Sequence, residues 1–169
     1  MVIWMTGISG AGKTTIANSI IKSYKHKFPN LVNLDGDVIR QMYEDDLGYE
    51  EKDRIRQIKR IQKLCLFLEN QNLIVIVSAL YSNTELMDWN RKNFSEYFEI
   101  YLKATIDLVK ERDPKGIYEK FAKGEEKNLV GLDIAWHEPK KPNLVIDMDK
   151  TKSFSDVKKN IIKNLHFLK

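Results

Sequence analysis

The stretch Gly7-Ile8-Ser9-Gly10-Ala11-Gly12-Lys13-Thr14 decides the fold of this chain. It fits the phosphate-binding loop (P-loop) pattern, in which a glycine and four free positions precede Gly-Lys-Ser/Thr. An apolar run at residues 2–5 precedes it and predicts a buried strand, and apolar residues at helical spacing follow it over residues 15–23. Because the motif requires a strand, this loop and a helix in that order, we predict a site for nucleotide phosphates here.

Each part of the loop has a predicted role in binding ATP. Backbone N–H groups of its small residues curl around the phosphates, and the helix N-terminus adds a partial positive charge. Lys13 is predicted to reach the β- and γ-phosphates, and the Thr14 hydroxyl to ligate Mg²⁺. The loop residues predicted to bind ATP are Gly7, Ser9, Gly10, Ala11, Gly12, Lys13, Thr14 and Thr15. A glycine-rich turn that matches by chance is the alternative, which the flanking strand and helix disfavour.

Length and composition set limits on the rest of the chain. A chain of 169 residues is most simply one domain over 1–169, long enough to bury a core. The net charge of +4, from 28 basic and 24 acidic residues, suits an anionic substrate but does not indicate nucleic acid. A single cysteine, Cys65, excludes an internal disulfide and favours a cytoplasmic location. No apolar run approaches the roughly 18 residues that a membrane span needs, so we expect no membrane partner.

Strand-like and helical patterns alternate along the chain. Strands are predicted at 31–34, 73–77, 97–102 and 144–146, and helices at 38–43, 52–70, 83–93, 106–112 and 153–168. The alternation predicts an α/β fold, a three-layer P-loop NTPase sandwich whose parallel sheet has helices on both faces and ligands at the C-terminal strand ends. Residues 113–142 interrupt it with prolines, glycines and charges, and 117–122 within them can be helical. A long excursion of this kind is typical of a lid.

Two aspartates follow the second predicted strand, where parallel-sheet geometry brings them beside the phosphate loop. Phosphoryl transfer needs charge neutralisation, positioning and a group that takes the acceptor's proton. We therefore predict Lys13, Asp35 and Asp37 as catalytic residues. Asp35 would hold Mg²⁺ with Thr14, partly through water, and Asp37 would orient or deprotonate an acceptor hydroxyl; which aspartate is the base stays open. Asp37 is also a good N-cap for the next helix, and the two roles can coexist.

Further motifs resemble those of one family, the adenylyl-sulfate (APS) kinases. They are Asp35-Gly36-Asp37 with Arg40, Asp46-Leu47-Gly48-Tyr49, Asp53-Arg54, Arg112-Asp113-Pro114-Lys115-Gly116-Ile117-Tyr118, Gly131-Leu132-Asp133 and Pro139. The resemblance extends over about residues 1–149, with the motifs in order and at near-constant spacing. It implies an ATP-dependent kinase that moves the γ-phosphate of MgATP to the 3′-hydroxyl of a nucleotide whose 5′-phosphate carries a sulfate.

The same resemblance implies roles for individual residues. Arg40 and Arg54 would hold the 5′ anionic group of the acceptor, and Arg112 and the lid residue Lys115 would lie near ATP or the transferred phosphate. The residues implied for acceptor binding are Asp37, Arg40, Tyr49, Arg54, Gln57, Ser78, Ala79, Leu80, Lys127 and Leu129. Because the family often forms dimers, a homodimer stays open for this chain.

The departures from the family pattern concentrate on the acceptor. Gln57 stands where the family has an asparagine, and the family's Phe-Ile-Ser-Pro-Tyr-Arg run is replaced by Ala79-Leu80-Tyr81-Ser82-Asn83-Thr84. In the family two aromatic residues stack on adenine. Tyr49 matches one of them, but Leu129 replaces the other. Stacking a base on an aromatic ring is worth about 1–3 kcal/mol, so losing one wall weakens adenine binding by up to about a hundredfold.

Three functions stay open after this comparison. We favour a kinase acting on cytidine 5′-diphosphoramidate, the acceptor of one relative of the APS kinases in capsular phosphoramidate biosynthesis. A true APS kinase whose departures are neutral drift is the alternative. A nucleotide-binding module without catalysis is the third possibility, and the intact Lys13, Thr14, Asp35 and Asp37 disfavour it.

Overall fold

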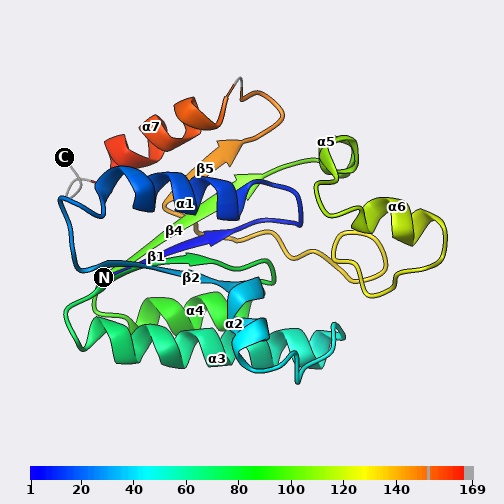
Figure 1. Ribbon diagram of the computed structural model, residues 1–169. Helices are drawn as coiled ribbons and strands as arrows, with labels where there is room; N and C mark the ends of the chain where they lie inside the picture. The colour runs from blue at the N-terminus through cyan, green and yellow to red at the C-terminus, as the bar shows by residue number, and fades with distance from the viewer. Residues whose placement is uncertain (152, 166–169) are drawn as a thin grey trace.

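The computed structural model describes residues 1–151 and 153–165, and its centre is a parallel sheet. Within these residues five strands pair in the order β2-β3-β1-β4-β5, all parallel (Figure 1). They are β1 (Val2–Thr6), β2 (Leu31–Asp35), β3 (Ile74–Ser78), β4 (Tyr97–Lys103) and β5 (Leu144–Asp147). Every residue of β1 is buried, as expected for a central strand covered on both faces.

Helices cover both faces of the sheet. On one face lie α1 (Lys13–Tyr24) and α7 (Phe154–Asn164), and on the other lie α3 (Glu51–Glu69) and α4 (Thr84–Asn93) (Figure 1). The short helices α2 (Gly36–Met42) and α5 (Ile106–Arg112) follow the C-terminal ends of β2 and β4, and α6 (Ile117–Ala122) follows α5. The predicted three-layer α/β arrangement is therefore confirmed, with most element bounds within two residues of the prediction.

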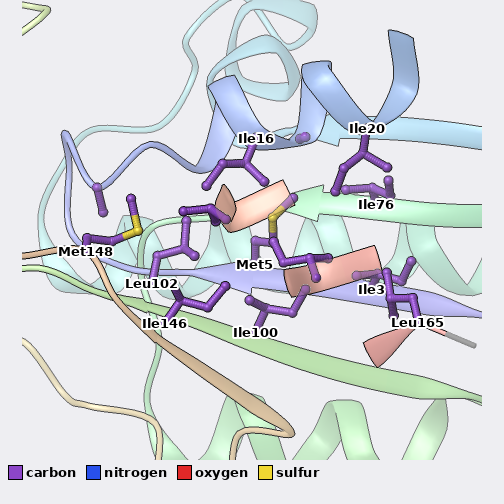
Figure 2. Close-up of a cluster of buried hydrophobic side chains, with 14 of the residues drawn as sticks. Ile3, Met5, Ile16, Ile20, Ile76, Ile100, Leu102, Ile146, Met148 and Leu165 are labelled. Atoms are coloured by element: carbon purple, nitrogen blue, oxygen red, sulfur yellow. The ribbon is translucent and has the colours of Figure 1, made fainter. Parts of the chain in front are cut away.

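Side chains of successive strand residues point to opposite faces of the sheet, so the molecule has two separate hydrophobic cores. Ile3 and Met5 point into the core beneath α1 and α7, where they meet residues such as Ile16 of α1 (Figure 2). Trp4 points into the opposite core with Cys65 of α3. Cys65 is fully buried and burial raises the pKa of its thiol, so this cysteine is an unreactive core residue.

Two predicted features near helix ends were wrong. The N-cap of α2 is Asp35, because its Oδ1 accepts the N–H of Asp37 at 2.9 Å and Asp37 itself lies in the first turn. The last helix, predicted over 153–168, is capped by Ser153 and ends at Asn164 because the next backbone position leaves helical geometry. The remainder of that prediction, 166–168, lies outside the described residues.

The segment 113–142 leaves the sheet after β4 and α5 and packs against the phosphate loop. Tyr118 of α6 is buried with Ile8 and Leu129, and its hydroxyl donates to the carbonyl of Ser9 at 2.9 Å. This segment thus closes over the loop in the present conformation, and its opening as a lid stays a prediction. Among residues 1–151 and 153–165, no helix has both the length and the apolar character required to span a bilayer.

Candidate active site

The phosphate loop needs its glycines for conformational and steric reasons. Gly10 and Gly12 have φ values of 80° and 97°, in the left-handed region that residues with a Cβ rarely adopt. A Cβ on Gly7 would lie 2.6 Å from the carbonyl oxygen of Leu102. The glycines therefore permit a tight backbone turn at this point, the kind of turn whose N–H groups can surround an anion.

Lys13 lies at the start of α1 and folds back over the loop. Its Nζ donates to the carbonyls of Gly7 at 2.6 Å and Ile8 at 2.9 Å. Burial lowers the pKa of Lys13 from 10.5 to about 8, although the nearby carboxylates of Asp37 and Asp35 oppose this shift. A charged group held in a site that desolvates it is stabilised further by an anion, as a bound polyphosphate would provide.

Thr14 and Asp35 offer two oxygen atoms at one point. The Thr14 hydroxyl donates to Oδ2 of Asp35 at 2.6 Å, while the other carboxylate oxygen caps α2. No group of three or more His, Cys, Asp or Glu side chains in the described part of the chain is placed to hold a metal. Mg²⁺ in nucleotide enzymes needs only one or two protein oxygens besides phosphate and water. The chemistry of this pair therefore fits the predicted Mg²⁺ site.

A cavity of about 830 Å³ extends from the phosphate loop to the end of β3 and the segment 113–142. The predicted site residues that line it are Ser9, Gly10, Gly12, Lys13, Thr14, Thr15, Asp35, Asp37, Arg40, Tyr49, Arg54, Gln57, Ser78, Ala79, Leu80, Arg112, Lys115, Lys127 and Leu129. Gly7 and Ala11 do not line it; the Ala11 side chain is fully buried in the core under α1.

Asp37 and Lys115 form an ion pair across this cavity. Their side chains are 59% and 55% exposed, so the pair adds little to the stability of the fold. Its importance lies in its position, because it joins the first turn of α2 to the segment 113–142 beside Lys13.

Two arginines lie on one tyrosine at the other end of the cavity. The guanidinium carbons of Arg40 and Arg54 lie 4.7 and 5.6 Å from the centre of the Tyr49 ring. Each arginine is 7% exposed and donates to a backbone carbonyl at 2.9 Å, Arg40 to Leu47 and Arg54 to Tyr49. Neither forms a salt bridge within residues 1–151 and 153–165. Two nearly buried cations without a carboxylate partner are suited to an anionic ligand.

Comparison with known proteins identifies the family. The model of the adenylylsulphate kinase family matches residues 1–147. The chain belongs to this family. A cytidine diphosphoramidate kinase from Campylobacter jejuni is 35% identical over 164 residues, 97% of this chain and 95% of its own. A probable adenylyl-sulfate kinase from Archaeoglobus fulgidus is 36% identical over 149 residues, 88% of this chain and 96% of its own.

The fold of a solved family member agrees with that of this chain. The Mycobacterium tuberculosis APS kinase, solved in complex with AMPPNP and APS, superposes with a TM-score of 0.89 at 28% identity, covering 98% of this chain and 96% of its own. The predicted P-loop NTPase fold is therefore confirmed. As a member of the APS kinase family, the chain is an ATP-dependent kinase.

The structure also shows where the departures from the APS kinase pattern lie. Leu129 is 6% exposed and borders the same cavity as Tyr49. Gln57 donates its amide to the Gly36 carbonyl at 3.1 Å, so this side chain already braces the start of α2. The ring of Tyr49 contacts two arginines. The sequence had indicated only that this ring stacks on the base of the acceptor.

Two aromatic residues of the cavity were missed from the sequence. Phe154, at the start of α7, packs against Gly12 and lies 5.5 Å beneath the guanidinium of Arg112. Tyr81, after β3, borders the cavity and donates its hydroxyl to Oε1 of Glu51 at 2.5 Å. Helical periodicity identified the helix that begins at Phe154, but nothing local in the sequence indicated that this ring meets the phosphate loop.

Proposed function

We propose that this kinase transfers the γ-phosphate of MgATP to the 3′-hydroxyl of cytidine 5′-diphosphoramidate, a step of capsular phosphoramidate biosynthesis. One observation carries the proposal: the acceptor end of the cavity retains Arg40 and Arg54 on Tyr49 but has Leu129 where a second aromatic wall is expected. Such a site keeps its affinity for a 5′ anhydride and loses stacking energy for a large base. The Campylobacter jejuni relative supports this choice of acceptor.

Adenylyl sulfate is the second candidate acceptor. The Archaeoglobus fulgidus relative is as similar as the Campylobacter jejuni one, at 36% against 35% identity. Adenylyl sulfate and cytidine diphosphoramidate share a ribose 3′-hydroxyl and an anionic 5′ anhydride. The phosphoryl-transfer residues are therefore the same for both, and only the base and the terminal group distinguish them.

The proposed reaction gives each of these residues a role in the transfer. Asp37 takes the proton of the acceptor's 3′-hydroxyl, and Lys115 beside it brings a positive charge from the segment 113–142 toward the transferred phosphate. Lys13 and the loop N–H groups hold the donor phosphates, and Arg40 and Arg54 fix the acceptor's 5′ end. Mg²⁺, held by Thr14 and Asp35, would neutralise charge on the β- and γ-phosphate oxygens.

Phe154 is expected to contribute to the donor side of the site. Its ring is 39% exposed and borders the cavity beside Gly12, so a base attached to the bound phosphates can stack on it. Replacing Phe154 with alanine should raise KM for ATP by about tenfold, since base stacking is worth about 1–3 kcal/mol. The acceptor KM should stay the same. Initial-rate kinetics with Phe67→Ala, an exposed phenylalanine of α3, provides the control, and an unchanged KM for ATP would contradict the assignment.

An acceptor panel tests the proposed function directly. ADP release should be measured with adenylyl sulfate, cytidine diphosphate, cytidine 5′-diphosphoramidate and no acceptor. A kcat/KM highest for cytidine 5′-diphosphoramidate supports the proposal. A preference for adenylyl sulfate replaces it with the APS kinase function, and ATP turnover with no acceptor-dependent component rejects both.

Leu129→Phe tests whether residue 129 determines which nucleotide base the acceptor site prefers. Restoring an aromatic ring should shift the ratio of kcat/KM toward adenine acceptors by about tenfold or more, because stacking favours the larger base. Leu132→Phe, on the same segment but absent from the cavity lining, is the matched control. An unchanged adenine-to-cytosine ratio in Leu129→Phe would show that residue 129 does not face the base.

A further inference from the structure

The hydroxyl of Ser78 has no hydrogen-bond partner within the described chain. Ser78 ends β3, is 4% exposed, and borders the large cavity. Its Oγ atom is fully buried, and no donor or acceptor of the protein satisfies it. Because a buried polar group without a partner destabilises a fold, such a group at a cavity wall is expected to serve a ligand.

The register of the sheet fixes the direction in which this hydroxyl points. Ser78 is two residues beyond Ile76, whose side chain packs in the core under α1, so both face α1. Ser78 pairs in register with Asp35 of β2 on one side and with Met5 of β1 on the other. Asp35 also points toward α1, where its carboxylate receives the hydroxyl of Thr14. The Ser78 hydroxyl therefore lies beside the Thr14–Asp35 pair, on the phosphate-loop side of the sheet.

This position changes the role expected for Ser78. The family resemblance implied a contact with the acceptor, whereas the nearly buried arginines of the acceptor end, Arg40 and Arg54, come from α2 and α3. Ala79, the next residue along, packs in the opposite core with α3 and α4, as strand alternation requires. The end of β3 thus presents Ser78 to the donor side of the cavity.

We infer that Ser78 is a positioning residue of the Mg²⁺ site, which it serves by binding a water molecule of the hydrated ion. Mg²⁺ gives up its waters reluctantly, and Thr14 with Asp35 supplies only two protein oxygens, so bound waters remain that need partners. A serine hydroxyl can accept from such a water and can donate in turn. The phosphates already have Lys13 and the loop N–H groups. This inference rests on the proposed MgATP-dependent reaction but not on which acceptor is used.

The test separates metal binding from nucleotide binding. Mn²⁺, used in place of Mg²⁺, is titrated into the protein–ADP complex by electron paramagnetic resonance, and ADP binding is measured separately in EDTA. Ser78→Ala should weaken Mn²⁺ binding by about tenfold, as loss of a partner behind metal ligands typically does. ADP affinity in EDTA should remain within about twofold of wild type. The melting temperature without ligands should stay the same or rise, because the variant no longer buries an unpaired hydroxyl.

Two further variants keep the result interpretable. Ser78→Thr retains the hydroxyl and should restore Mn²⁺ affinity. If the alanine variant does not fold, Ser78→Cys takes its place, because cysteine is close to serine in volume but is a poor hydrogen-bonding group. Ser82→Ala is the control, because Ser82 is also buried but its hydroxyl donates to the His137 carbonyl at 3.1 Å. It should lower the melting temperature and leave Mn²⁺ affinity unchanged.

Each other outcome overturns the inference in a recognisable way. Equal losses of ADP affinity with and without metal would place Ser78 on the phosphates, and a change in acceptor KM alone would place it on the acceptor. Unchanged Mn²⁺ affinity in Ser78→Ala, with normal metal dependence in wild type, overturns the inference and leaves the proposed function standing. Wild-type nucleotide binding and turnover with no dependence on a divalent cation would overturn the proposed function and this inference together.

Discussion

Replacing Lys13 with alanine is expected to lower phosphoryl transfer by at least about a hundredfold, the typical effect of losing one preorganised charge donor at a transition state. The ammonium is held by two loop carbonyls, at 2.6 and 2.9 Å, so it is already positioned before the reaction. Charge develops on the transferred phosphoryl group, and a fixed cation stabilises it without reorganisation. The effect should appear mainly in kcat, measured as ADP release at saturating acceptor.

The fold should survive the same substitution. Burial lowers the pKa of Lys13 to about 8, well below the value of the unfolded chain, so its charge destabilises the folded state at neutral pH. Losing that charge offsets the loss of its hydrogen bonds, and the melting temperature should change little. Lys22→Ala, an exposed lysine of the same helix, controls for a general charge effect. Turnover near the wild-type value in Lys13→Ala would refute the assignment of Lys13.

The elements of this fold could be predicted because each has a local signal. The apolar, β-branched run that forms β3 has no charge, and the regular apolar spacing of α3 is helical over its whole length. The helix at 117–122 was predicted with its observed bounds. The N-cap of α2 was misassigned to Asp37 because Asp35 and Asp37 are both good caps and only the backbone geometry distinguishes them.

The contacts within the candidate site had no such local signal. Asp37 and Lys115 are 78 residues apart, and the phosphate loop and Phe154 meet only because α1 and α7 share one face of the sheet. Both contacts depend on the order of the strands in the sheet, which the hydrophobic periodicity of the sequence does not encode. Strand order likewise puts Ser78 beside Asp35. Sequence motifs could therefore indicate which residues gather at the strand ends, whereas the sheet decides which of them touch.

Replacing Asp37 with asparagine is expected to lower kcat by about a hundredfold or more, the usual contribution of a positioned general base. The amide keeps the shape of the side chain but cannot take the proton of the acceptor's hydroxyl. KM for ATP should change little, because the phosphate loop is unaltered. Asp45→Asn is the matched control: Asp45 is exposed, lies outside the cavity lining and has a positive φ that asparagine tolerates.

The pair with Lys115 requires a second comparison, because Asp37→Asn also removes a charge that contacts the segment 113–142. Lys115→Met breaks the same pair and leaves the carboxylate in place. If Asp37 is the base, the acidic limb of the pH profile of kcat/KM should disappear in Asp37→Asn and persist in Lys115→Met. If the pair only holds the segment closed, both variants should lower kcat/KM alike and keep that limb. The Asp37 carboxylate would then only hold the segment 113–142 in place, and a group other than Asp37 would take the proton of the acceptor's hydroxyl.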